Sequence, residues 1–102
     1  DIREVAGLPL AQGQEFLRKE YTLMLTLHKL NQEKPVIAVA DGFVIGAGAG
    51  LFMAAETRVA TTASSFSMPE CVLGITPDVG ATDFLSSEVM PGNIGRWMLL
   101  TG

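Results

Sequence analysis

The chain has 102 residues, of which 48% are hydrophobic and 18% are charged, and its formal net charge is -4 at pH 7. So apolar a composition excludes a disordered chain, and the length allows at most one small domain. The negative balance offers no broad basic face, so we expect no nucleic-acid partner. The apolar runs are short and interrupted, which predicts no membrane span, and no targeting signal is visible. The lone Cys71 cannot form an internal disulfide or a thiolate zinc site, which fits a reducing compartment.

The first predicted element is an amphipathic helix over residues 11–31. Its apolar side chains recur at helical spacing, and we expect them to belong to the core: Phe16, Leu23, Met24, Leu27 and Leu30. The charged side chains of this segment can face water, and His28 is interpreted as a surface or packing residue. Lys34 and Pro35 are expected to end the helix, because helical backbone is disfavoured before a proline.

Short strands and helices alternate along the rest of the chain. Residues 36–42 are predicted as a buried strand, and residues 43–56 begin as a strand and become a helix at a run of glycines. Residues 58–61 and 64–68 are predicted as further short strands. Residues 79–88 are predicted as a helix that Asp78 could cap, and residues 91–102 as another helix with a glycine in its interior. This alternation predicts the α/β class.

The glycine run GAGAG, Gly46–Gly50, lies where a strand is expected to give way to a helix. Small residues there would let a ligand approach the backbone, and the first NH groups of a helix can bind an anion or a developing oxyanion. The alternative is that small residues only let the helix pack closely. A dinucleotide site is not indicated, because GAGAGL places Leu51 at the third spaced position of GxGxxG.

Two acids, Glu70 and Asp78, lie in the nearly uncharged stretch SMPECVLGITPDVG. Glu70 has no basic residue near it in sequence, so its carboxyl group should either reach solvent or have a raised pKa. Such a carboxylate is a candidate acid, base or nucleophile. Asp78 alone could equally be a helix cap, and Cys71 is interpreted as a small core residue.

Several segments, taken in order, carry a family resemblance: DIR, KPVIAVADGFVIGAGAGL, RVAT, FSMPE, GITPDVGATDFL and LTG. Together they resemble the crotonase (enoyl-CoA hydratase/isomerase) superfamily over nearly the whole chain. The resemblance implies that residues 1–102 are part of a single core domain, a ββα spiral lacking its N-terminal strands and C-terminal helices. We therefore expect an internal part of a longer protein, inactive by itself.

The same resemblance implies an acyl-CoA substrate whose thioester carbonyl oxygen is held by two backbone NH groups. One donor would be the NH of Ala47, where relatives usually have glycine, with Gly46 and Gly48 as substrate-binding neighbours. It implies no metal and no cofactor other than the coenzyme A of the substrate. A homo-oligomer is possible, and a mitochondrial location is implied by the resemblance, with the cytoplasm as the alternative.

The acids discriminate between branches of that superfamily. Hydratases similar to this chain have glutamates at the positions of Gly50 and Glu70, so the glycine here disfavours their shared-water chemistry. MPE followed by PDVG resembles the 3-hydroxyisobutyryl-CoA hydrolase branch, which would make Glu70 and Asp78 catalytic. EFLRKEYTL resembles that branch's FxxEYxL and would make Glu20 a substrate-binding residue.

The resemblance therefore implies a thioester hydrolase in which Glu70 attacks the carbonyl carbon or activates water, and Asp78 orients the substrate hydroxyl or the water. Three alternatives stay open. One is a Δ3,Δ2-enoyl-CoA isomerase, which needs a single carboxylate at the Glu70 position, and another is a hydratase-family enzyme. The third is a non-catalytic structural subunit of a large assembly such as a mitochondrial ribosome.

Overall fold

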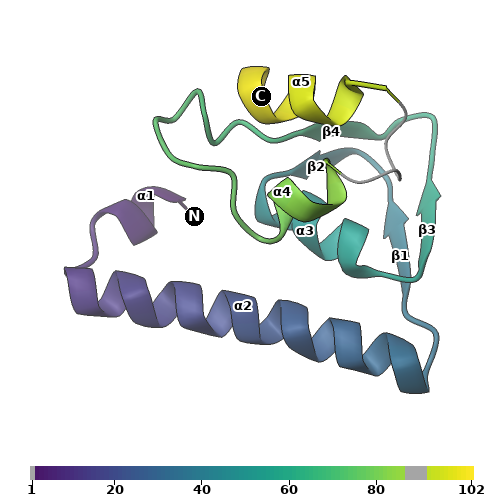
Figure 1. Cartoon of the computed structure of the whole chain (residues 1–102), viewed down its shortest axis with the longest axis horizontal. Helices are drawn as coiled ribbons and strands as arrows, with labels where there is room; N and C mark the ends of the chain where they lie inside the picture. Colours follow the sequence, from purple (N-terminus) through teal and green to yellow (C-terminus); the bar gives the residue numbers. More distant parts are fainter. Residues whose placement is uncertain (1, 87–91) are drawn as a thin grey trace.

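A computed structural model describes residues 2–86 and 92–102 of the chain (Figure 1). Its elements in chain order are α1 (Ile2–Ala6), α2 (Leu10–Glu33), β1 (Ile37–Ala40), β2 (Phe43–Ile45), α3 (Ala47–Ala54), β3 (Thr57–Ala60), β4 (Ser65–Ser67), α4 (Ala81–Phe84) and α5 (Ile94–Thr101). Strands and helices alternate after α2, so the predicted α/β class is confirmed. The change from strand to helix falls at the glycine run, as the sequence predicts.

The strands form two parallel pairs that interleave along the chain. β1 pairs with β3 in a register that runs from Ile37 opposite Thr57 to Ala40 opposite Ala60. The predicted burial of β1 is wrong for Ile37 and Val39, which are exposed because successive side chains of a strand point to opposite faces and only Ala40 is fully buried. β2 pairs with β4, and their last residues, Ile45 and Ser67, are partners. The unit β1–β2–α3 is thus followed by a second pair of strands, each hydrogen-bonded beside its counterpart in the first pair. This is the predicted partial ββα spiral. Parallel pairing requires such crossovers, and α3 lies within both of them.

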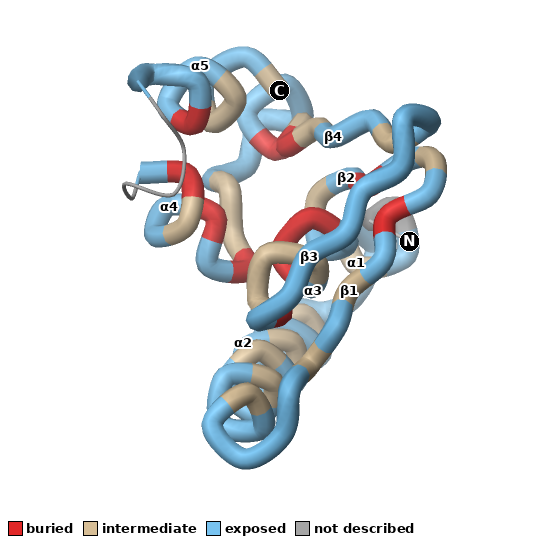
Figure 2. The backbone as a smooth tube through the Cα atoms, turned by 90° about the vertical axis from the view of Figure 1, so that its right-hand side faces the viewer, coloured by how far each residue is buried: buried red, intermediate tan, exposed pale blue. Residues whose placement is uncertain are grey.

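The core is small and joins the strands, α3 and the segment before α5. Figure 2 shows the buried stretches in the strand ends, in α3 and around α4. The packed apolar residues are Ala40, Val44, Ala49, Met68, Val79, Ala81 and Leu85. Met68 and Val79 are the large side chains that are almost completely enclosed. Because Glu70 closely follows Met68 and Asp78 precedes Val79, the core fixes the backbone next to both acids.

The long helix α2 lies along one side of the rest of the molecule (Figure 1). It ends at Glu33 as predicted, and the NH of Lys34 donates to the carbonyl oxygen of Leu30 at 2.8 Å. Asn31 anchors it to α3 by donating from Nδ2 to the carbonyl oxygen of Ala54 at 2.6 Å.

The predicted core role of the α2 side chains is wrong for most of them. No residue of α2 is fully buried. Phe16, Leu23 and Leu30 are exposed, whereas Met24 and Leu27 are half-buried. The physical reason is that α2 packs mainly on α3 and α1, which cover only a narrow part of its apolar stripe. His28 and the charged side chains of α2 face solvent, with Glu20 half-buried as the exception.

The C-terminal helices are shorter than predicted. Only Ala81–Phe84 is helical in the segment predicted as helix 79–88, whose last two residues lie outside the described part. The cap residue of α4 is Gly80, and no side chain caps it, so the expectation that Asp78 caps this helix is wrong. α5 falls within the predicted range 91–102, of which residue 91 is not described. None of the described helices is long and apolar enough to cross a membrane.

Gly95 in α5 gives the first testable prediction, because a Cβ at that position would lie 2.7 Å from the carbonyl carbon of Leu85. The added methyl group would have to displace the backbone of α5 or that of Leu85. Gly95→Ala should therefore lower the free energy of unfolding of the full natural chain by about 1–3 kcal/mol. Chemical denaturation measures this change. Gly13→Ala is the matched control, since nothing lies within 4 Å of its added Cβ. It should be neutral or stabilising by up to ~1 kcal/mol; equal effects of the two changes would contradict the close packing of α5 on Leu85.

Candidate active site

The carboxyl ends of β2 and β4 bring the glycine run and Glu70 together. Gly46 follows β2 directly, and its NH donates to the carbonyl oxygen of Ser67, the last residue of β4, at 3.0 Å. The chain then runs through Met68 to Glu70, whose Oε1 lies 2.9 Å from where a Cβ on Gly46 would be. Gly46 also has a φ of +54°, which disfavours any side chain. Glycine at position 46 is therefore what allows the Glu70 carboxyl group to lie against this backbone.

The first amides of α3 directly follow Gly46, against which that carboxyl group lies. Gly46 is the N-cap residue, and its carbonyl oxygen accepts the NH groups of Ala49 and Gly50. Within the described residues, no acceptor lies on the NH groups of Ala47 and Gly48. Free amides at the positive end of a helix dipole suit a negatively charged oxygen. The predicted oxyanion donor, Ala47, thus directly follows the residue that touches Glu70.

Glu70 is the one buried charged residue in the described ranges, with 5% of its surface exposed. Its carbonyl oxygen accepts the NH groups of Leu73 and Ile75, which holds the turn after it. Its side-chain Oε2 is buried and has no hydrogen-bond partner among the described residues. Burial raises the pKa of Glu70 above its ordinary value, its own backbone NH lowers it in part, and the negative charge of Asp78 raises it further.

Asp78 and Glu20 complete a group of three acids from three segments of the chain. Both are half-buried, Glu20 on α2 and Asp78 in the turn before α4. Burial raises the pKa of Glu20, and the negative charge of Asp78 raises it further. The charge of Asp78 thus acts on both glutamates, and no ion pair found in the described residues compensates any of the three. The charge of Asp78 therefore links the three acids that the sequence singled out.

These acids do not form a metal site in the described structure. No group of three or more His, Cys, Asp or Glu side chains within residues 2–86 and 92–102 is arranged to hold a metal ion. The free helix amides and the buried, unpartnered carboxyl oxygen instead suit a substrate that carries an oxygen able to become negative.

Gly48 and Gly50 face in different directions from α3. Gly48 lines a hollow of about 320 Å³ between α3 and the strands β1 and β2. Gly50 is buried, and a Cβ on it would lie 2.5 Å from Cγ2 of Val79. Gly46 and Gly50, four residues apart, therefore face the acids and Val79, whereas Gly48 faces the strands. The space next to Gly50 is filled by Val79.

Cys71 is exposed, so its predicted place in the core is wrong. Its thiol donates to the carbonyl oxygen of Leu99 at 2.8 Å. The physical reason is the tight turn after Glu70, in which Gly74 NH donates to the Cys71 carbonyl oxygen, and which turns this side chain toward α5.

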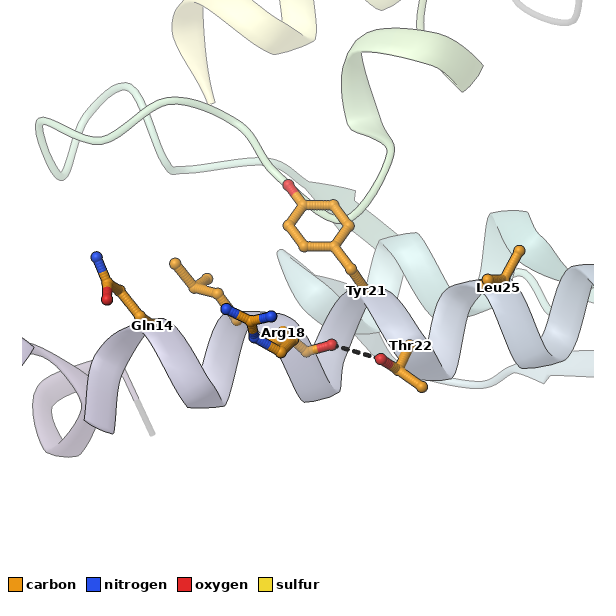
Figure 3. A pocket seen from close by; sticks show the side chains of 6 residues that line it. Gln14, Arg18, Tyr21, Thr22 and Leu25 are labelled. Atoms are coloured by element: carbon orange, nitrogen blue, oxygen red, sulfur yellow. Dashed lines mark hydrogen bonds between the residues drawn. The ribbon is translucent and has the colours of Figure 1, made fainter. Parts of the chain in front are cut away.

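A wider hollow of about 600 Å³ lies on α2 (Figure 3). It is lined by Gln14, Leu17, Arg18, Tyr21, Thr22 and Leu25. Thr22 Oγ1 donates there to the carbonyl oxygen of Arg18 at 2.7 Å, a bond within one helix turn. One helix supplies all of its walls, and Glu20, Glu70 and Asp78 are not among them.

The interleaved parallel strands, with free helix amides next to a buried acid, define a crotonase-type α/β domain. The chain belongs to the enoyl-CoA hydratase/isomerase family, whose family model matches residues 1–102. The likeness extends to solved structures. An enoyl-CoA hydratase from Rhodobacter sphaeroides 2.4.1 superposes with a TM-score of 0.81 and 41% identity, covering 90% of this chain and 26% of that one.

The chain is also similar to several longer proteins. Probable 3-hydroxyisobutyryl-CoA hydrolase 3 of Arabidopsis thaliana is 42% identical over 88% of this chain and 23% of its own length. The mitochondrial 3-hydroxyisobutyryl-CoA hydrolase of Xenopus tropicalis is 40% identical over 100% of this chain and 26% of its own length. Small ribosomal subunit protein mS47 of Neurospora crassa is 38% identical over 89% of this chain and 18% of its own length. The chain thus spans about a quarter or less of the length of these relatives.

Sequence reasoning missed Val79. Its φ is +47°, a left-handed conformation that is an outlier for a β-branched residue, and its side chain is 1% exposed. No pattern in the sequence marks this, because valine is typical of strands and cores. The neighbouring glycine, Gly80, was the available sign of an unusual turn.

The charge on Glu70 predicts how stability depends on pH. Because the folded state raises the pKa of this carboxyl group, its stabilising contribution is present below the ordinary value of 4.5 and is lost as pH rises through the folded value. Glu70→Gln removes that buried charge, so it should raise the free energy of unfolding at pH 7 and give a smaller gain near pH 4. Urea denaturation of the full natural chain at both pH values measures this difference. Glu56→Gln, at an exposed position, is the control, and a pH-independent difference for Glu70→Gln would contradict the prediction.

Proposed function

We propose that the protein is an acyl-CoA thioester hydrolase, with 3-hydroxyisobutyryl-CoA as the substrate to test first. The observation that carries this proposal is the buried Glu70 carboxyl group lying against Gly46, next to the free NH of Ala47. A nucleophile or base and an oxyanion donor are the two groups that acyl transfer requires. The relatives named as 3-hydroxyisobutyryl-CoA hydrolases support the choice of substrate.

In the proposed reaction, the thioester carbonyl oxygen binds at the Ala47 NH. The ionised Glu70 attacks the carbonyl carbon, or takes a proton from a water molecule that does so. Negative charge then develops on the carbonyl oxygen and is stabilised by the helix amide. Collapse of this intermediate breaks the C–S bond, and the coenzyme A thiolate leaves and takes up a proton. In the covalent route, water then hydrolyses the acyl–Glu70 anhydride and restores the carboxylate.

Asp78 and Glu20 are proposed to bind the polar part of the substrate. Ionised carboxylates only accept hydrogen bonds, so they suit a hydroxyl group or a water molecule that needs to be oriented. The negative charge of Asp78 acts on Glu70, which supports this role for Asp78. Gly46 and Gly48 would contribute backbone to the substrate site, with Gly46 touching Glu70.

Hydration of an enoyl-CoA by two glutamates is disfavoured because residue 50 is glycine, and Val79 occupies the space that a side chain there would need. A second carboxylate at position 50 would begin with a Cβ that lies 2.5 Å from Val79 Cγ2 and 2.7 Å from Val79 Cβ. Contacts this short do not occur without displacement of one partner. An isomerase, which needs one carboxylate, stays as the second enzymatic candidate.

A non-catalytic role is favoured by one specific observation, the similarity to small ribosomal subunit protein mS47. In that case the protein would sediment with a large particle rather than free. The name of the Xenopus tropicalis relative supports a mitochondrial location as part of the proposal. Assembly into a homo-oligomer stays a prediction.

The role of Glu70 is tested by following thiol release from 3-hydroxyisobutyryl-CoA with the full natural chain. Glu70→Gln keeps the shape of the side chain and removes its charge, so kcat should fall by about 100-fold or more, with binding of the CoA ester retained. Crotonyl-CoA hydration is followed in parallel. Retained thiol release in Glu70→Gln would rule out the proposed role. Double-bond migration without thiol release would indicate an isomerase, and neither activity in a folded, particle-bound protein would indicate a structural subunit.

Asp78→Asn separates substrate orientation from a purely structural role. If Asp78 orients the hydroxyl group or the water, kcat per folded molecule should fall by roughly 10-fold or more, because reacting groups lose their alignment. Steady-state thiol release with the folded fraction measured by circular dichroism tests this. Asp83→Asn, an exposed acid in the first turn of α4, is the control. Turnover of Asp78→Asn equal to that of the control would show that Asp78 takes no part in the reaction.

A further inference from the structure

Val79 has an unusual backbone conformation directly after a proposed catalytic acid. It is the one non-glycine residue with a positive φ in the described ranges, at +47°. Gly80 follows with a φ of +80°, and the NH of Ala81 donates to the Asp78 carbonyl oxygen at 2.8 Å. A four-residue turn with positive φ at both central positions is normally built from glycine, asparagine or aspartate. A β-branched residue in such a turn persists only where its surroundings hold it there.

Gly50 is the neighbour that holds the Val79 side chain. Val79 is 1% exposed, and its Cγ2, Cβ and carbonyl oxygen would lie 2.5, 2.7 and 3.0 Å from a Cβ on Gly50. The missing side chain of Gly50 is therefore the space that Val79 occupies. Gly50 itself has no positive φ, so room, and not backbone conformation, is the reason for glycine at this position.

The turn fixes the backbone position of Asp78, from which its carboxylate projects. Its residues are tied on one side to the core through Val79 and on the other to α4 through the Asp78–Ala81 hydrogen bond. Asp78 is the residue whose charge acts on both Glu70 and Glu20. A rotation of this turn would move that carboxylate relative to both glutamates.

We propose that the contact between Val79 and Gly50 is the positioning device of the site. Gly50 makes room for Val79, and the buried Val79 holds the left-handed turn that directs the Asp78 carboxylate toward Glu70 and Glu20. This inference rests on the proposed function of the two acids and adds Val79 and Gly50 to it as positioning residues.

The charged surroundings of Glu70 make the effect of this device measurable. The negative charge of Asp78, in the turn before α4, acts on Glu70 and also on Glu20 of α2. Cys71, next to Glu70 in the chain, has its thiol hydrogen-bonded to the Leu99 carbonyl oxygen. None of the ion pairs found in the described residues includes these groups. Displacement of Asp78 should therefore appear directly in the titration of Glu70.

The test is Gly50→Ala in the full natural chain, with the Glu70 carboxyl group titrated by carbon-13 NMR. The added methyl group must displace Val79 and with it Asp78, so the titration midpoint of Glu70 should move down, in the same direction as in Asp78→Asn. In the double variant, Gly50→Ala should add nothing to the change caused by Asp78→Asn. For thiol release, kcat of Gly50→Ala should fall by about 10- to 100-fold, with KM nearly unchanged. Gly13→Ala, a helical glycine with open space around it, should change neither property.

A second variant covers the case in which Gly50→Ala does not fold. Val79→Gly cannot clash and frees the turn, so it should also lower the Glu70 midpoint and kcat. An unchanged Glu70 midpoint in a folded variant, with only its stability reduced, would overturn the proposal and leave a packing contact. The NMR titration needs no turnover. A shifted midpoint in a protein that releases no thiol would therefore retain the positioning device and reject the hydrolase.

Discussion

The parallel pairing of β2 with β4 is the interaction on which the site depends. It places Ile45 opposite Ser67, so the residues that follow the two strands emerge side by side at the same edge. From one strand the chain enters α3 through Gly46, and from the other it reaches Glu70. The Gly46 NH bond to the Ser67 carbonyl oxygen fixes the distance between these two paths. Ligand sites of parallel α/β sheets commonly lie beyond the carboxyl ends of their strands, and here the free helix amides and the buried acid meet there.

The three acids are held together at an electrostatic cost. Burial without a cation, together with the negative charge of Asp78, raises the pKa of Glu70 and so favours its protonated form. An acid in such surroundings is a stronger base than an exposed carboxylate once it is ionised. The arrangement therefore lowers stability at neutral pH and makes the ionised Glu70 carboxylate more reactive. Core residues on both sides, Met68 before Glu70 and Val79 after Asp78, provide the packing that keeps the acids in place.

Three glycines serve the fold for different physical reasons. Gly46 needs a positive φ and leaves space for the Glu70 carboxyl group. Gly50 leaves space for Val79, and Gly95 allows the backbone of α5 to touch that of Leu85. A glycine within a predicted helix usually weakens the prediction, as Gly95 did for the last one. Here its cost in helix propensity is offset by a close packing that no other residue allows.

The sequence by itself determined the order and type of the elements after α2 and the place where the strand becomes α3, and it singled out the candidate acids. These follow from local chemistry: β-branched runs, a proline after the long helix, and carboxylates in apolar surroundings. Tertiary structure decided which side chains are enclosed. It left the apolar stripe of α2 mostly uncovered, turned Cys71 outward, and shortened α4. It also placed Val79 in a left-handed turn against Gly50, because that conformation is set by contacts between segments distant in the chain, which no local pattern records.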